Sequence, residues 1–559
     1  MAEASALQAK RPWLTWYEPG VPYTLEYPDF SVADFLIQAY QQWPQRTAII
    51  FRRRRFTYAE LYANAARMAG VLRGLGVQPS DRVAIMLPNC PQFVIALFGA
   101  LFAGAIVVPT SPLYTAREAM SQLNNAGAKV VIALRRHFPM LSEIADAVGL
   151  RHVITTPLQE TLPLPDRWLF PLVARSQTDA RDAENSRFHR WGRVMKQFPP
   201  IDDPFRAKPG DLAVLQFTGG TTGLSKGAML THRNLVANCL QIRNWFARDE
   251  RRVDVYLGAI PFFHIYGLTV VVLSTVSIGA AVVHIDRFDV NDVVRAIRKH
   301  RPTVFHGVPT MYVAINRAAE KWKVDFSCIE TCMSGSAPLP LGVQKRFEEL
   351  TKGKLVEGYG LTEASPVTHV NPLGATRKIG SIGVPIPDTE CKIVDPVDPS
   401  RELPVGEGGE LALRGPQVMQ GYWQAPEETT AVLRDGWLYT GDIARMDEDG
   451  FFYIVDRKKD MILVGGFNVY PREVEEVLVE HPSVAEAVVV GVPDEYRGEA
   501  VKAFVVPKDG TVVDEEELRT FARRRLAPYK VFRILEVRQS MPKTAVGKVL
   551  RRLLREGKA

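Results

Sequence analysis

Short apolar segments alternate with an amphipathic helical segment over residues 45–135, and this alternation constrains the fold more than any other feature. Residues 57–76 place apolar side chains at helical spacing and then reach a glycine, which predicts one helix. The segments with strand character cover residues 47–51, 82–88, 105–110 and 128–134. Because strands that alternate with helices form a parallel sheet covered by those helices, we expect such a sheet here.

The alternation returns after Asp211, which predicts a second layer of sheet and helices. Residues 160–205, before this point, are polar and irregular, so we expect a long connection or insertion there. The strands expected in the second part cover residues 213–220, 254–260, 280–285, 302–308, 330–336 and 354–360.

The chain changes character at about residue 370, where short segments are broken by Gly, Pro and Asp. This pattern predicts an antiparallel, β-rich unit. From Asp460 onward, helical and strand-like segments predict a small α+β domain. We therefore expect an α/β protein with a large N-terminal domain (1–456, β-rich from about 370), a hinge (457–461) and a small C-terminal domain (462–559).

The composition excludes several classes of protein. With 46% hydrophobic and 23% charged residues, the chain is neither largely disordered, nor a collagen, nor a coiled-coil rod. Five cysteines at irregular spacing do not predict a disulfide scaffold, and Cys328 and Cys332 are expected to be thiols rather than half of a zinc site. The apolar runs 93–108 and 268–283 are each 16 residues long, so we expect a buried helix and strand rather than a membrane span.

Positive charge is concentrated at the C-terminal end. The net charge is +7, but residues 519–559 contain thirteen Lys or Arg and two acids, or +11, which leaves −4 for the rest. A basic tail can bind nucleic acid, an anionic membrane or a polyphosphate ligand. Few aromatic residues interleave the tail, so nucleic acid is not expected. The run Arg52–Arg55 fits a hairpin turn as well as a binding patch.

A Gly/Thr-rich loop, Thr218–Gly227, follows a predicted strand and precedes a predicted helix. Glycines let the backbone turn its N–H groups toward an anion, while hydroxyl groups and Lys226 add donors and charge. The loop matches neither the Walker A motif nor the dinucleotide glycine fingerprint. It is either a surface loop or a site for a nucleotide triphosphate.

Further motifs follow this loop in order. They are Tyr359–Glu363 (YGLTE), Tyr439–Asp442 (YTGD), Asp456–Asp460 (DRKKD), Gly465–Pro471 (GGFNVYP) and Pro542–Lys548 (PKTAVGK). With them the chain resembles the adenylate-forming family, which includes acyl-CoA synthetases, luciferases and peptide-synthetase adenylation domains. Residues 87–123 also resemble the long-chain fatty acid–CoA ligase branch. Glu357 and Phe532 depart from the family's common pattern.

The resemblance implies two half-reactions that use ATP, Mg²⁺ and coenzyme A. A carboxylate attacks the α-phosphate of ATP and releases pyrophosphate, and the thiol of coenzyme A then displaces AMP. Lys548 would cancel charge between the two anions of the first step. Glu363, with Thr218 ranked second, would hold Mg²⁺, and Thr362 would contact the α-phosphate.

The resemblance also assigns the nucleoside and acyl contacts. Tyr359 would stack on adenine, and Asp442 with Arg457 would hold the ribose. His264, Gly307 and Gly335 would line the acyl pocket. The other positions assigned to nucleotide or phosphates are Gly219, Gly220, Thr221, Thr222, Gly223, Lys226, Gly335, Ser336, Ala337, Glu357 and Gly358.

A mobile small domain is implied as well, because one fold must serve two reactions. Lys459 would be the hinge residue, rotation would withdraw Lys548, and Gly466 would line the pantetheine tunnel. Lys459, Gly466 and Lys548 are all expected to contact a cofactor.

Three other functions stay open. The chain could pass its acyl group to a carrier protein, or activate another carboxylate, or it could bind an acyl group or nucleotide without catalysis. We expect a cytoplasmic monomer or homodimer without a nucleic-acid partner, and its basic surface serves either reversible contact with anionic membranes or the phosphates of ATP and coenzyme A.

Overall fold

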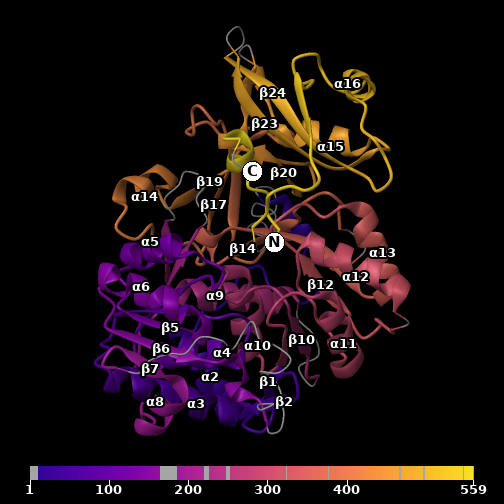
Figure 1. Cartoon of the computed structure of the whole chain (residues 1–559). Helices are drawn as coiled ribbons and strands as arrows, with labels where there is room; N and C mark the ends of the chain where they lie inside the picture. Colours follow the sequence, from indigo (N-terminus) through magenta and orange to yellow (C-terminus); the bar gives the residue numbers. More distant parts are fainter. Residues whose placement is uncertain are drawn as a thin grey trace, which may run out of the picture.

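The computed structural model describes residues 11–163, 185–218, 226–246, 252–322, 324–374, 377–464, 467–494, 498–544 and 547–557. These residues form a large body with a smaller body stacked on it, and the C-terminal end of the chain returns to the junction between them (Figure 1). The α/β fold class with a large and a small domain is confirmed.

A seven-stranded sheet occupies one side of the large body, in the order β7-β6-β5-β3-β4-β8-β9. All its pairings are parallel except β8 with β9, which confirms the expected parallel sheet. Its strands are β3 (Arg82–Met86), β4 (Ile106–Pro109), β5 (Val130–Leu134), β6 (His152–Thr156), β7 (Phe188–Arg190), β8 (Leu212–Phe217) and β9 (Gly227–Thr231).

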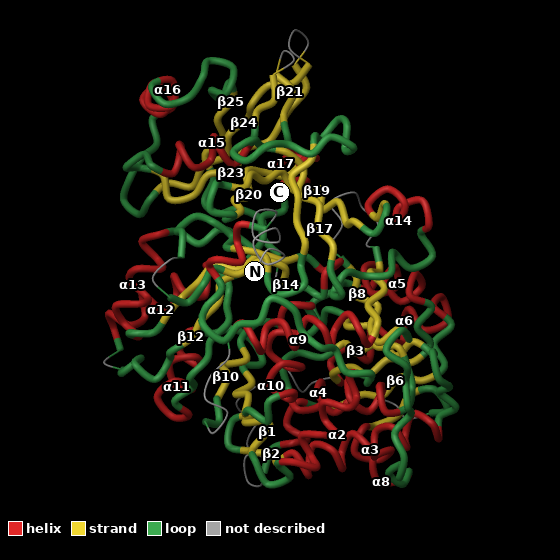
Figure 2. Tube along the Cα trace, turned by 180° about the vertical axis from the view of Figure 1, so that it is seen from behind, coloured by secondary structure: helices red, strands yellow, loops and turns green. Residues whose placement is uncertain are grey.

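Helices cover both faces of this sheet (Figure 2). Alternate residues of β3 point to opposite faces, so that Val83 joins one apolar cluster and Ala84 another. All twelve residues of α4 are buried, which confirms the helix and strand expected over 93–108. The helices of this half are α2 (Val32–Gln42), α3 (Tyr58–Gly74), α4 (Pro91–Phe102), α5 (Ala116–Ala126), α6 (Phe138–Val148), α8 (Trp191–Gln197) and α9 (His232–Trp245).

The second layer consists of two four-stranded sheets, β10-β11-β1-β2 and β12-β13-β14-β15. Arg52 and Arg53 form the turn of the β1–β2 hairpin, so the hairpin accounts for the arginine run. The strands are β1 (Thr47–Phe51), β2 (Arg54–Thr57), β10 (Val255–Gly258), β11 (Ala281–His284), β12 (Thr331–Ser334), β13 (Lys354–Gly360), β14 (Val367–Val370) and β15 (Val384–Pro385).

The strand predicted over residues 302–308 is wrong. This segment forms only isolated bridges, from Val304 to β10 and β12 and from Gly307 to Ser334. Gly307, in the interior of the segment, has no side chain to pack against neighbouring strands, which weakens a regular strand. Val304 nevertheless joins the two sheets, because it bridges Tyr256 on one side and Thr331 on the other.

Helices pack against this second layer (Figure 1). Gly267–Leu273 is a π-helix that continues into α10, and β11 follows, which confirms the helix and strand expected over 268–283. The other helices are α11 (Val290–His300), α12 (Pro309–Lys321) and α13 (Leu341–Thr351), with α10 at Ser274–Ser277. In the described part of the chain no helix is long and apolar enough to cross a membrane.

The region expected to be irregular over 160–205 is partly regular. After a 3₁₀ turn at Leu158–Thr161, the described part contains β7 and α8. Trp191, Val194 and Met195 of α8 are buried, and their contacts with the core make this short polar-looking segment helical. Residues 164–184 lie outside the described residues.

The expected antiparallel unit is confirmed. Its sheet has the order β16-β17-β19-β18, with β20 paired to β19, and all pairings are antiparallel. Its elements are β16 (Glu390–Val394), β17 (Gly409–Arg414), α14 (Pro426–Val432), β18 (Leu433–Arg434), β19 (Trp437–Met446) and β20 (Phe452–Arg457).

A 3₁₀ turn at Lys458–Asp460 leads from β20 into the small body. Two apolar clusters cover opposite faces of its sheet, one under α15 and α16 and the other under α17. Its elements are β21 (Ile462–Val464), β22 (Phe467–Val469), α15 (Pro471–Val479), β23 (Val484–Asp494), β24 (Gly498–Pro507), α16 (Glu515–Arg523), β25 (Ile534–Val537) and α17 (Arg551–Arg555).

Acidic side chains of the small body neutralise most of the basic tail. At least nine of the thirteen tail cations pair with acids within residues 460–556, for example Lys530 with Glu473 and Arg551 with Glu475. Residues 462–559 together contain 17 Lys or Arg and 15 Asp or Glu, which gives +2. The net charge of +11 therefore describes residues 519–559 alone, and the whole small body is nearly neutral.

Candidate functional site at the domain junction

The buried carboxylate of Asp442 on β19 organises one end of the site. The Tyr359 hydroxyl, at the end of β13, donates to Asp442 Oδ2 at 2.5 Å, and Arg457 Nε lies 3.3 Å from Asp442 Oδ1. Asp442 and Arg457 are neighbours because β19 and β20 pair in that register. Burial, followed by the Asp442 charge, raises the pKa of Tyr359, so its hydroxyl remains a neutral donor.

The loop after β12 lies next to Tyr359. Ser334 at the end of β12 pairs in register with Glu357 of β13, two residues before Tyr359. Ser336 is exposed and has φ of 69°, so the loop turns sharply as it leaves the sheet. The structure thus brings the loop with Gly335, Ser336 and Ala337 beside the strand that carries Glu357, Gly358 and Tyr359.

Glu357 is buried behind this strand. It accepts a hydrogen bond from the backbone N of Leu339 at 3.3 Å. Burial raises its pKa to about 7, although the Leu339 hydrogen bond and the charge of Arg472 act in the opposite direction. Glu357 therefore supports the loop from behind, and no contact in this structure aims its carboxylate at the Tyr359 ring.

A second carboxylate, Glu363, lies in a 3₁₀ turn at Thr362–Ala364. The Tyr422 hydroxyl donates to its Oε1 at 2.7 Å, and the Lys226 ammonium lies 5.2 Å from the centre of the Tyr422 ring. Lys226 also pairs with Glu428. Tyr422 was missed by sequence reasoning, because nothing in its neighbourhood along the chain marks it as a partner of Glu363.

The two ends of the Gly/Thr-rich loop meet at this carboxylate end of the site. The backbone N of Thr218 donates to the carbonyl of Lys226 at 2.9 Å. The loop residues Gly219, Gly220, Thr221, Thr222 and Gly223 lie outside the described residues, as does Gly466. Thr218 is thus bonded to Lys226, and Lys226 and Glu363 both contact Tyr422.

The Lys548 loop of the small body reaches the large body. The loop is closed by hydrogen bonds from Thr544 N to Lys548 O (2.8 Å) and from Leu550 N to Pro542 O (2.9 Å). Gly547 has φ of 76°, and a Cβ added there would lie 3.2 Å from Thr310 Oγ1 at the start of α12. A glycine is thus suited both to the turn and to the close approach.

Lys548 also acts electrostatically on His264. Burial, followed by the charge of Lys548, lowers the pKa of His264 to about 4, so the imidazole is neutral at neutral pH. Its Nδ1 accepts the backbone N–H of Tyr266 at 3.3 Å. A neutral histidine held by the backbone fits a lining residue better than a general base.

Gly335 and Gly307 line the same region as His264. A Cβ on Gly335 would lie 3.3 Å from the Tyr266 ring, and one on Gly307 would lie 3.1 Å from the Tyr312 ring. Both tyrosines are anchored through their hydroxyls to the carbonyl of Met333, at 2.8 and 3.0 Å. Tyr266 and Tyr312 are further residues that the sequence did not single out.

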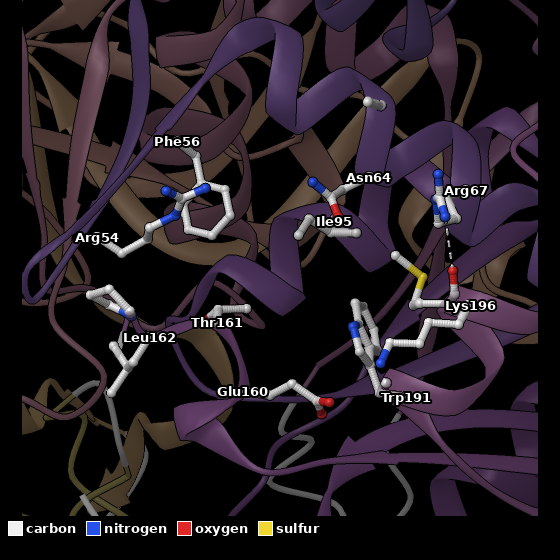
Figure 3. A pocket seen from close by; sticks show the side chains of 14 residues that line it. Arg54, Phe56, Asn64, Arg67, Ile95, Glu160, Thr161, Leu162, Trp191 and Lys196 are labelled. Atoms are coloured by element: carbon white, nitrogen blue, oxygen red, sulfur yellow. Dashed lines mark hydrogen bonds between the residues drawn. The ribbon is translucent and has the colours of Figure 1, made fainter. Parts of the chain in front are cut away.

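A separate cavity of about 550 Å³ lies at the opposite end of the large body. Figure 3 shows Arg54 and Phe56 facing Glu160 and Trp191 across it, with Arg67 bonded to the carbonyl of Met195. None of the predicted site residues lines this cavity.

Two family models match the chain. The model described as AMP-binding enzyme matches residues 36–423, and the one described as AMP-binding enzyme C-terminal domain matches residues 473–548. This chain belongs to the AMP-binding enzyme family. The two matches divide the chain on either side of β20 and the Lys458–Asp460 turn.

Relatives within the AMP-binding enzyme family match nearly the whole chain. A long-chain-fatty-acid–CoA ligase of Bacillus subtilis is 46% identical, over 98% of this chain and 98% of its own. A feruloyl-CoA synthase of Amycolatopsis is 39% identical, over 91% and 95%. The crystal structure of ATP-bound MatB from Rhodopseudomonas palustris has a TM-score of 0.82 at 29% identity and covers 94% of this chain and 98% of its own.

Proposed function

We propose that this member of the AMP-binding enzyme family is an ATP-dependent fatty acid–CoA ligase that forms an acyl-adenylate and then an acyl-CoA, with AMP and pyrophosphate as products. The 46% identity to the Bacillus subtilis ligase over 98% of both chains carries the proposal and favours a long-chain acid. The gathering of Lys548, His264 and Gly335 at the domain junction supports it, because a carboxylate bound there would lie next to a cation.

The similarity to a feruloyl-CoA synthase favours a second candidate substrate class, aromatic acids. A screen of carboxylates from C2 to C18 together with aromatic acids, with AMP and pyrophosphate as readouts, separates the two. Turnover with and without coenzyme A also separates a ligase from an enzyme that serves a carrier protein. A chain that forms no AMP with any acid would contradict the proposal.

Glu363 fits a Mg²⁺ ligand. Its carboxylate is partly exposed and accepts one hydrogen bond, from Tyr422. In the described part of the chain no three His, Cys, Asp or Glu side chains gather to bind a metal by themselves, which suits an ion held by one carboxylate, phosphates and water. Mg²⁺ would offset phosphate charge there, and Thr218 would contribute a hydroxyl.

Asp442 and Arg457 are proposed to hold the ribose, and Asp442→Asn tests this role. Hydrogen bonds to a charged group contribute about 1.5–3 kcal/mol each, so we expect kcat/KM for ATP to fall by at least roughly tenfold. KM for the fatty acid should change little. Asp435→Asn is the matched control, since Asp435 is exposed in the β18–β19 turn and has a φ of 50° that asparagine tolerates.

Contact with anionic membranes remains a proposal. Residues 462–559 carry a net charge of only +2, and most cations of the tail are paired within the small body. This charge distribution favours a role of Lys548 at the nucleotide over a basic surface that binds membranes. Co-sedimentation with anionic and neutral vesicles at low and high salt tests it: binding to anionic vesicles alone, lost at high salt, would support a basic membrane surface. We propose a monomer or homodimer, which sedimentation velocity would distinguish.

The hinge and domain bounds are part of this proposal. Residues 1–456 would form the large domain, 457–461 the hinge around Lys459, and 462–559 the small domain. The short turn at Lys458–Asp460 between β20 and β21 supports this division.

A further inference from the structure

Asp456, the last residue before the proposed hinge, contacts a helix that begins after it. Its carboxylate is 3% exposed. Oδ1 accepts the backbone N–H of Arg457 at 2.6 Å, and Oδ2 accepts that of Arg472 in the first turn of α15 at 2.7 Å. The N-cap residue of α15, Tyr470, makes no side-chain cap hydrogen bond. Asp456 therefore caps α15 from the other side of the hinge.

The side chain of Arg472 returns to the strand that carries Asp456. Its guanidinium donates from NH1 to the carbonyl of Ile454 on β20 at 2.8 Å and from Nε to Glu476 at 2.8 Å. Its charge also lowers the pKa of Glu357 in the large body, against the effect of burial. The backbone N–H and the side chain of Arg472 therefore both bond to β20, on the other side of the proposed domain boundary.

These contacts depend on the arrangement of the two bodies seen here. Rotation about the Lys458–Asp460 turn would leave β20 with the large body and carry α15 away. Contacts beyond the turn would survive, because Arg551 pairs with Glu475 inside the small body at 2.7 Å, and it also reaches Asp460 at the end of the turn at 3.6 Å. The arrangement seen here is the one in which Gly547 approaches Thr310.

We propose that Asp456 and Arg472 form a latch that holds the small domain in the arrangement that presents Lys548 to the first half-reaction. The link to the first half-reaction rests on the proposed function, whereas the latch itself rests only on the contacts described above. Both are positioning residues, since neither lies among the residues assigned to substrate. Loss of a helix cap shifts an equilibrium by roughly five- to thirtyfold, and that is the expected change in the ratio of the two domain arrangements.

A distance measurement tests the latch without any substrate. Val397 in the large body and Val512 in the small body are 93% and 89% exposed, so Val397→Cys and Val512→Cys can carry spin labels after Cys328→Ser and Cys391→Ala. Asp456→Ala and Arg472→Ala should each increase the population of a second interdomain distance.

The matched control removes a cap inside the small body. Asp514 caps α16 by accepting the backbone N–H of Glu517 at 2.8 Å, so Asp514→Ala loses the same chemistry without crossing the hinge. It should keep the distance distribution of the parent protein despite a similar loss of thermal stability. Asp456→Asn keeps a hydrogen-bond acceptor, so its second interdomain distance should be less populated than that of Asp456→Ala. A parental distribution in both Asp456→Ala and Arg472→Ala would overturn the latch.

Kinetics provide the second readout. In the latch variants, pyrophosphate release should slow by no more than the population shift, while thioester formation from supplied acyl-adenylate should be unchanged or faster. Equal losses in both half-reactions would contradict the proposal. If the parent protein activates no carboxylate, the proposed function fails, and the distance measurement alone decides the latch.

Discussion

Replacing Lys548 with alanine should slow acyl-adenylate formation by about 10²–10³-fold, because one positioned charge acting on a developing anion contributes that much to a rate. Two anions meet in the proposed step, and the Lys548 loop approaches the large body at Thr310, with the charge of Lys548 acting on His264. Thioester formation from supplied acyl-adenylate should stay nearly intact, since a thiol attacking a mixed anhydride requires no such cancellation. Separate assays of pyrophosphate release and thioester formation measure the two rates.

Lys543→Ala is the matched control for this experiment. Lys543 belongs to the same loop but pairs with Glu486 inside the small body, at 2.7 Å. Its loss should leave both half-reactions close to the parental rates, because a surface ion pair contributes little. If Lys548→Ala reduces both half-reactions equally, its assignment to the first step is wrong.

The second large effect is expected at the hinge, where Lys459→Pro should permit pyrophosphate release and block transfer to coenzyme A. Lys459 lies in the 3₁₀ turn at Lys458–Asp460. Proline fixes φ near −65°, a value that a 3₁₀ turn already uses. The arrangement seen here should therefore persist while rotation away from it is prevented.

Lys459→Ala separates the backbone from the side chain in this test. Alanine removes the ammonium group but leaves φ and ψ free, so both half-reactions should proceed. Parental rates of thioester formation in Lys459→Pro would show that rotation about this turn is not required.

The sequence predicted those features that depend on local periodicity. The helix α3 was expected because its apolar residues recur with the helical period of about 3.6 residues. The strand β3 was expected because its apolar residues form a short continuous run. Both patterns can be recognised from neighbouring residues alone. The segment 302–308 was also expected to be a strand but forms only bridges at Val304 and Gly307. Whether an apolar run becomes a strand depends on neighbours that lie far away in sequence.

The same limit applies to the site. Asp442, Arg457 and Tyr359 were recognised through motifs, and the structure brings them together. Tyr422 lies 59 residues from Glu363 and belongs to no such motif, so only the fold shows that it holds this carboxylate. The basic tail of residues 519–559 suggested a basic domain for a related reason, because most of its acidic partners precede residue 519 in the chain.

The neutralised tail has a consequence for the energetics of domain rotation. If the small body rotates as proposed, its net charge of +2 over 98 residues means that almost no net charge would move past phosphates bound at the junction. The electrostatic work of the swing is then concentrated in the few cations at its tip, Lys548 above all, and does not accumulate over the whole domain. Added salt should accordingly weaken nucleotide binding far more than it displaces the balance between the two domain orientations.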